Sequence, residues 1–177
     1  DADADAVADD EANVVLAKLN GLGIGHQTYA HPPVPTIEEQ SKVLGGLPGR
    51  LTKNLLLKDK KAGTFLVTVA FDRVVDMKKL PTLLGVAKNA NLRFTDASLL
   101  KVEKGAVSPY AVINDAEGVV TSVLDASLAP GGGDGSNILT HPLRSDQTVS
   151  ASPADVVKFL EAVGHKPLIV DFGAASA

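Results

Sequence analysis

The chain has 177 residues, of which 45% are hydrophobic and only 4% aromatic, so Ala, Val and Leu must fill a core that this length can bury. A formal net charge of -4 argues against a protein that coats long nucleic acid, although a local basic patch can still bind one nucleic-acid end. The sequence has no cysteine, which excludes disulfides, thiolate zinc sites and thiol nucleophiles.

No apolar run reaches the length of a membrane span, and the N-terminus lacks the charged-then-apolar order of a signal peptide. We therefore expect a cytoplasmic protein that does not enter a membrane. Residues 1–9 are acidic and of low complexity, which is typical of a solvated tail. We expect one domain over residues 10–173 and a small-residue tail over residues 174–177.

The first half of the chain is predicted to contain two helices, a short strand and a hairpin. Thr36-Ile37-Glu38-Glu39 is a capping-box pattern that opens a helix ending near Leu44. The remaining expected elements are a helix over 9–22, a strand over 26–30 closed by the proline-rich residues 31–35, and a hairpin of strands 51–59 and 64–70.

The second half is predicted to mix helices with a second hairpin. Ser152-Pro153 begins the last helix as cap and first helical residue, and Gly164 ends it. The other expected elements are helices over 76–84 and 95–102, hairpin strands over 109–114 and 118–124, and strands over 138–143, 148–151 and 168–172. The absence of regular strand–helix alternation indicates the α+β class, with a mixed, mostly antiparallel sheet.

Lys53 and Asn54 form a polar pair at the start of the apolar strand 51–59. A lysine in this position either extends to water along its aliphatic stem or holds its ammonium against a ligand. Local sequence favours the first of these two fates, since lysines are mostly exposed.

Two loop motifs are candidates for chemistry. Gly105-Ala106-Val107-Ser108-Pro109 lies between a predicted helix and a predicted strand, where backbone N–H groups can face a ligand. The alternative is an ordinary helix-to-strand turn. His141-Pro142 follows the apolar pair Ile138-Leu139, and its alternative is a structural histidine.

Other chemistries find no support in the sequence. The four histidines are spread over separate elements without carboxylates at ligand spacing, so no metal is expected. The glycines of residues 131–133 lack the strand before them and the Lys-Ser/Thr after them that a phosphate loop needs. No Gly-x-Ser-x-Gly elbow is present. We therefore expect neither a metal nor a cofactor.

Taken together, these motifs resemble the YbaK/prolyl-tRNA-synthetase-associated editing domain family. The resemblance rests on four segments in the family's order, and it runs from about Val14 to Phe172. They are Thr52-Lys53-Asn54-Leu55, Gly105 to Pro109 followed by Ile113-Asn114-Asp115, Thr140-His141-Pro142-Leu143, and Gly164-His165-Lys166-Pro167.

The resemblance implies a curved, mostly antiparallel sheet flanked by helices and a hydrolase that removes alanine from mischarged proline tRNA. Its partners would be the acceptor end of aminoacylated proline tRNA and prolyl-tRNA synthetase or a synthetase complex. Lys58, Lys60, Lys61, Lys101 and Lys104 flank the implied site and could meet terminal phosphates, the alternative being solvated surface lysines.

The resemblance also assigns roles to residues. Lys53 would hold the terminal phosphate or ribose, and Asn54 would brace the substrate or the backbone. His141 would orient the substrate or polarise the attacking water. Gly105 and the following Ala106, Val107, Ser108 and Pro109 would place N–H groups near the ester carbonyl. No covalent intermediate is implied.

Two departures from the family pattern bear on substrate choice. Leu56 and Tyr110 stand where phenylalanine is common in the family, and a smaller Leu56 would reshape the amino-acid pocket. The alternatives are therefore a deacylase of cysteinyl-tRNA(Pro) and, from a different class, a catalytically silent module that binds tRNA ends or docks on a synthetase. The sequence leaves the oligomeric state open.

Overall fold

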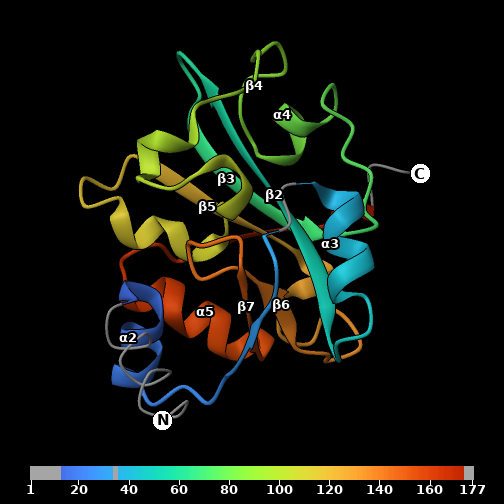
Figure 1. Ribbon diagram of the computed structural model, residues 1–177. Coiled ribbons are helices and arrows are strands. Elements are labelled where there is room, and N and C mark those ends of the chain that lie inside the picture. Colours follow the sequence, from blue (N-terminus) through green and yellow to red (C-terminus); the bar gives the residue numbers. More distant parts are fainter. Residues whose placement is uncertain (1–12, 34–35, 174–177) are drawn as a thin grey trace, which may run out of the picture.

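The computed structural model describes residues 13–33 and 36–173, so the predictions for the two tails and for the start of the first helix lie outside it. In these residues eight strands form one sheet (Figure 1). The strands are β1 (Gln27–Ala30), β2 (Arg50–Asp59), β3 (Gly63–Ala70), β4 (Arg93–Phe94), β5 (Val120–Asp125), β6 (Ile138–Thr140), β7 (Gln147–Ala151) and β8 (Leu168–Val170).

Helices cover this sheet, and most of them begin at a side chain that caps their N-terminus. Asn13, Thr36 and Ser152 accept hydrogen bonds from the first turns of the three longer helices. The helices are α2 (Val14–Gly21), α3 (Ile37–Leu44), α4 (Leu80–Leu83) and α5 (Pro153–Ala162), with 3-10 helices η1 (Ala97–Leu100), η2 (Lys104–Ala106), η3 (Pro109–Asn114) and η4 (Ala126–Leu128). None of the described helices is long and apolar enough to cross a membrane.

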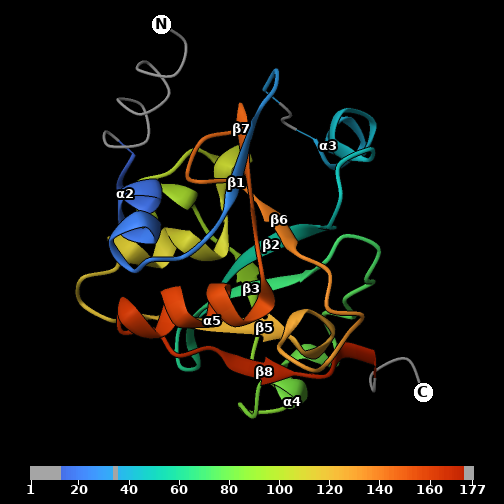
Figure 2. The same cartoon turned by 90° about the horizontal axis from the view of Figure 1, so that it is seen from below.

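The sheet is mixed, as predicted, and its strand order is β1-β7-β6-β2-β3-β5-β8 with β4 paired to β2. The predicted hairpin is confirmed, because β2 and β3 pair antiparallel with Asn54 opposite Thr68. Antiparallel pairs also join β1 to β7, β6 to β7 and β2 to β4, whereas β2–β6, β3–β5 and β5–β8 are parallel. Figure 2 shows β1, β7 and β6 leading across the molecule to β2.

The predicted second hairpin is wrong. Residues 109–114 form η3 instead of a strand, and β5 pairs in parallel with β3 and β8. Pro109 fixes φ in the helical range and lacks an N–H group, and the hydroxyl of Ser108 accepts from the N–H of Tyr110 at 3.2 Å. This cap turns an apolar segment into a tight helix.

The two helices predicted between residues 76 and 102 are shorter than expected. Asp76 accepts from the N–H of Lys78 in a turn, and α4 begins only at Leu80. Asp96 does cap η1, but that element is a 3-10 helix that ends at Lys101 with a left-handed φ of 57°. The chain here contributes loops that pack over the sheet.

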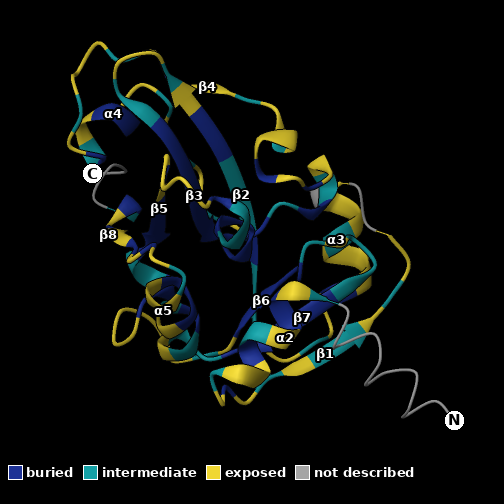
Figure 3. Cartoon of the chain, turned by 90° about the vertical axis from the view of Figure 1, so that its left-hand side faces the viewer, coloured by how far each residue is buried: buried dark blue, intermediate teal, exposed yellow. Residues whose placement is uncertain are grey.

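Two hydrophobic cores lie on opposite faces of the sheet, because side chains alternate along each strand. In β2, Leu56 belongs to the core that α2, α5 and η3 cover, and Leu57 to the core that α4 covers. Figure 3 shows β3 and β5 mostly buried and β2 largely half-buried between these layers.

A buried pair ties η3 to the end of α5. His165 Nε2 lies 2.8 Å from Asp115 Oδ2, and the N–H groups of Val119 and Val120 also donate to this carboxylate. Burial raises the pKa of Asp115, but the contact with His165 and the two N–H groups outweigh it and hold this pKa below its usual value.

Candidate active site

The outer edge of β2 is paired at both ends and open between them. It pairs with β6 at Arg50 and Leu51 and with β4 at Leu57 and Lys58. Over residues 52–56 this edge has no partner strand among the described residues. The open segment contains the Lys53–Asn54 pair.

Two carbonyls on this edge show which residues face outward. Thr52 O accepts from Gln40 Nε2 of α3 at 3.1 Å, and Leu56 O accepts from the N–H of Thr95 at 3.1 Å. Backbone groups of alternate residues in an antiparallel strand point to the same side, so the N–H and C=O of Asn54 also point into the opening.

A cavity of about 120 Å³ lies at this opening. It brings together five of the predicted site residues, namely Lys53, Asn54, Gly105, Val107 and His141. Its other lining residues come from α3, β2, the η2 loop and β6, and they are Thr36, Gln40, Thr52, Leu55, Lys104 and Thr140. The three sequence motifs therefore meet in one place.

The other predicted site residues lie behind the cavity wall. Leu56 is 4% exposed and belongs to the core, and its neighbour Leu55 lines the cavity instead. Ala106 also packs in that core, while Ser108 and Pro109 are buried at the start of η3. These residues shape the loop that presents Gly105 and Val107.

Asn54 is oriented by a residue that sequence reasoning missed. The buried Thr68 hydroxyl donates to Asn54 Oδ1 at 2.6 Å. The amide oxygen is thereby engaged on the β3 side, which leaves the Nδ2 hydrogens as donors for a ligand. The only signal for this contact is the cross-strand register of the hairpin.

His141 presents an unpaired nitrogen. Its Nδ1 lies 2.8 Å from Gln147 O, and because a carbonyl only accepts, Nδ1 carries the hydrogen. Nε2 is then an acceptor in the neutral ring, and it is buried with no partner among the described residues. The ring of His31, itself bonded to the Thr148 hydroxyl, lies 5.9 Å away.

The surroundings of His141 keep its ring neutral. Burial lowers the pKa of His141, and the nearby His31 lowers it further. The Gln147 carbonyl and Asp146 act in the opposite direction without overcoming burial. A histidine neutral at physiological pH can accept a hydrogen bond or a proton at Nε2.

Two further polar groups at the cavity have no partner. Thr140 Oγ1 is buried and unpaired in the described part of the chain. The N–H of Val107 likewise has no acceptor there, whereas the N–H of Ala106 is bonded to Glu103 O at 2.9 Å. Buried polar groups are almost always satisfied, so unpaired groups at one cavity indicate a place for a ligand.

Only some of the lysines near the predicted site lie at the cavity. Lys53, which is half-buried, and the exposed Lys104 line the cavity. Lys58 and Lys60 line a second hollow beyond β4, and Lys101 is exposed at the end of η1. Among the residues that the structure describes, no group of three or more His, Asp or Glu side chains is arranged to hold a metal ion.

Fold and site together define a domain with a small polar cavity on an open sheet edge, and comparisons with known proteins agree with this class. The family model of the aminoacyl-tRNA editing domain matches residues 31–159. The chain belongs to the aminoacyl-tRNA editing domain family, as the sequence motifs predict.

Relatives in animals and bacteria match most of the chain. The prolyl-tRNA synthetase associated domain-containing protein 1 of Danio rerio is 40% identical over 158 residues, covering 87% of this chain and 83% of the relative. The prolyl-tRNA editing protein ProX of Acetoanaerobium sticklandii is 35% identical over 161 residues, covering 88% and 94%.

Solved structures share the fold at low sequence identity. A crystal structure described as that of a candidate trans-editing enzyme for prolyl-tRNA synthetase has a TM-score of 0.59 and 18% identity, covering 89% of this chain and 94% of that chain. A hypothetical protein aligns with a TM-score of 0.65 and 20% identity, covering 88% and 97%.

Proposed function

We propose that this chain hydrolyses the ester that joins alanine to proline tRNA. The observation that carries this proposal is the convergence of Asn54, His141 and the Gly105–Val107 loop on one small cavity at an open strand edge. A cavity of about 120 Å³ is small beside the ~300–1,000 Å³ of ordinary ligand sites, which suits a small amino acid with the tRNA end outside.

In the proposed reaction, water attacks the ester carbonyl carbon and the carbonyl oxygen becomes an oxyanion. The N–H groups of Gly105 and Val107 stabilise this oxyanion, and His141 Nε2 accepts a hydrogen bond from the water or the ribose hydroxyl. The C–O ester bond then breaks, the ribose oxygen takes up the proton that the attacking water has lost, and alanine leaves with a free carboxylate. Lys53 holds the terminal phosphate or ribose, and the Asn54 amide braces the substrate.

A separate editing site meets a physical need. A synthetase pocket built for proline rejects a smaller amino acid poorly, because missing methylenes change binding by only about 1–3 kcal/mol. A second, smaller cavity admits alanine and excludes proline. Such an editing role also implies that charged proline tRNA reaches this chain from prolyl-tRNA synthetase or from a complex that contains it.

The test is a deacylation assay with alanine-, cysteine- and proline-charged proline tRNA. We expect hydrolysis of the alanyl ester and none of the prolyl ester. A preference for the cysteinyl ester would mean that the chain is a deacylase of cysteinyl-tRNA(Pro) instead. No hydrolysis of any ester by folded protein would leave the silent tRNA-binding module as the function.

A further inference from the structure

Positive charge is concentrated in one part of this acidic protein. Residues 53–104 contain eleven of the 17 Lys and Arg residues but only five of the 21 Asp and Glu residues. This segment contains most of β2 together with β3, α4, β4 and η1. A basic region on an acidic chain is typical of a local contact with a polyanion.

The strand β4 places part of this basic segment on the same edge of β2 as the cavity. Phe94 pairs with Leu57, and Arg93 pairs with Lys58, on the same edge of β2 that is open at Asn54. From Asn54 to Leu57 a strand advances by about 10 Å. Nucleotides of a stacked strand are spaced by about 3.4 Å, so this distance corresponds to roughly three nucleotides.

Phe94 is exposed beside this basic hollow. Its exposed fraction is 69%, whereas every other aromatic side chain in the described part of the chain is buried or half-buried. The hollow of about 450 Å³ beside it is lined by Lys58, Lys60 and Arg93, together with Asp59, Asn91 and Thr95. Exposed aromatic rings among cations form stacking platforms for single-stranded nucleic acid.

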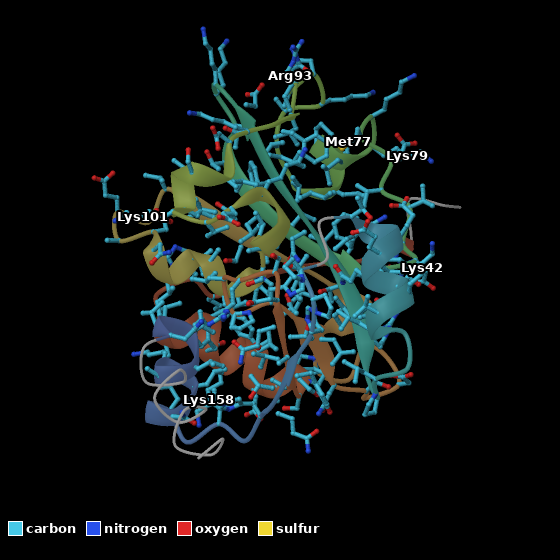
Figure 4. All side chains as sticks on the ribbon, viewed as in Figure 1. Lys42, Met77, Lys79, Arg93, Lys101 and Lys158 are labelled. Carbon is cyan, nitrogen blue, oxygen red and sulfur yellow. The ribbon has the colours of Figure 1, made fainter. Side chains whose placement is uncertain are left out.

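Arg93 and Asp59 are both held in place within the hollow. With the amide oxygen of Asn91 turned toward it, Arg93 donates from Nε and Nη2 at 2.9 and 3.0 Å, and its Nη1 remains for a phosphate. Asp59 accepts hydrogen bonds from the N–H groups of Ala62, Asn91 and Lys61, so its carboxylate stabilises the turn between β2 and β3. Figure 4 shows Arg93 at the end of the molecule that carries the β2–β3 hairpin.

We propose that the β4 surface, formed by Lys58, Lys60, Arg93 and Phe94, binds the single-stranded nucleotides that precede the terminal adenosine of tRNA. One base stacks on the Phe94 ring, and the phosphates on either side meet the three cations. The strand edge thereby guides the RNA from β4 into the cavity at Asn54. This inference rests on the proposed function, since it requires the aminoacyl end to occupy that cavity.

The first test measures binding of uncharged proline tRNA by fluorescence anisotropy. Phe94→Ala is expected to weaken binding about tenfold and Phe94→Tyr to restore it, because stacking needs an aromatic ring. Val74→Ala, at a side chain that is 83% exposed outside the β4 surface, is the matched control and keeps wild-type affinity. Equal affinity of wild type and Phe94→Ala would overturn the proposal.

A second arm identifies the ligand. The effect of Phe94→Ala is expected to vanish with tRNA that lacks its single-stranded 3′ nucleotides, and Arg93→Ala is expected to lower the salt slope of binding by about one. An undiminished Phe94→Ala effect on the truncated tRNA would contradict the proposal. Binding of polyglutamate as tight as that of tRNA would assign the surface to an acidic protein and overturn the proposal as well.

Comparing substrates separates this inference from the proposed function. The ratio of kcat/KM for alanyl-tRNA to that for alanyl-adenosine is expected to fall about tenfold in Phe94→Ala. If wild type hydrolyses neither ester but Phe94→Ala still weakens tRNA binding, the proposed hydrolysis is wrong and RNA binding by the β4 surface is supported. If wild type hydrolyses alanyl-tRNA and Phe94→Ala changes neither tRNA binding nor the kcat/KM ratio, only the proposal of RNA binding by the β4 surface is wrong.

Discussion

Thr68 and Asn54 face each other across the β2–β3 hairpin, and the Thr68 hydroxyl donates to Asn54 Oδ1 at 2.6 Å. This bond sets the orientation of an amide that lines the cavity, so in the proposed reaction Thr68 would act on the substrate only through Asn54. A residue of this kind is a positioning residue, and it can be tested without touching the site itself.

We expect Thr68→Val to lower kcat/KM for alanyl-tRNA(Pro) about five- to tenfold, since the net value of one hydrogen bond is about 1 kcal/mol. Thr68→Ser keeps the donor and is expected to retain activity. Thr64→Val, at a buried threonine on the same face of β3, is the control and should leave activity unchanged. An equal loss in the Thr64 and Thr68 variants would mean a general effect on the strand.

Lys53 is expected to contribute more than any other cation at the cavity. Lys53→Ala should lower kcat/KM about 10- to 100-fold, because a hydrogen bond from a charged donor contributes about 1.5–3 kcal/mol. The fold should persist, since Lys53 is half-exposed and has no ion-pair partner among the described residues.

The comparison for Lys53 is Lys42→Ala, which removes an exposed lysine of α3 that does not line the cavity (Figure 4). Steady-state kinetics and thermal unfolding of both variants provide the measurement. Wild-type rates from folded Lys53→Ala protein would remove Lys53 from the site.

We expect His141 to make activity dependent on pH. The Nε2 atom can accept a hydrogen bond only while the ring is neutral. Burial lowers the pKa of His141 from the usual value of 6.5. We therefore expect kcat/KM to hold at pH 6.5 and to fall at lower pH, as the ring gains a proton. A pH–rate profile that starts to fall above pH 7 would contradict this assignment.

The same shift in the pKa of His141 affects stability. Between the lowered folded pKa and the unfolded value near 6.5, the unfolded state binds more protons, so stability increases with pH. The contribution is fully present above pH 6.5 and is lost as pH falls through the folded pKa. His141→Asn can keep the donor to Gln147 O, and its melting temperature should depend less on pH in this range.

Tyr110 carries a hydroxyl that the fold does not use. Its ring is fully buried and packs edge-on against Phe159, with the ring centroids 4.8 Å apart. Its hydroxyl has no partner among the described residues. We expect Tyr110→Phe to leave the free energy of unfolding unchanged or to raise it by about 1 kcal/mol, since an unpaired buried hydroxyl is costly.

Urea unfolding of Tyr110→Phe and of Tyr110→Leu checks this prediction. The leucine variant loses the ring and should be less stable, which separates the hydroxyl from the packing. A loss of 2 kcal/mol or more in Tyr110→Phe, beyond the usual ~1 kcal/mol of a hydrogen bond, would mean that the hydroxyl has a partner.

The parts of the fold that follow from the sequence are those decided by neighbouring residues. The β2–β3 hairpin, the Thr36 cap and the Ser152-Pro153 helix start all depend on a few consecutive side chains. The apolar run of residues 109–114 suits either a strand or a helix, and the Ser108 cap decides in favour of the helix. The parallel partners of β5 depend on distant segments that leave no local pattern.

The candidate site was predictable to the same extent. Lys53, Gly105 and His141 belong to motifs that can be found along the chain, and the structure brings these motifs together. Gln40 and Thr68 reach the site through helix docking and strand register, which no spacing in the sequence reveals. The two-residue strand β4 is too short to leave any periodic signal.

The open edge of β2 also bears on how the protein avoids aggregation. An unpaired strand edge offers its backbone groups to other chains and invites them to associate. Here the stretch without a partner strand spans only residues 52–56, strands pair with β2 at both ends of it, and Gln40 donates to the Thr52 carbonyl. Among the described residues the vacant backbone groups are therefore confined to the few residues around Asn54, and such an edge is too short to start a growing sheet.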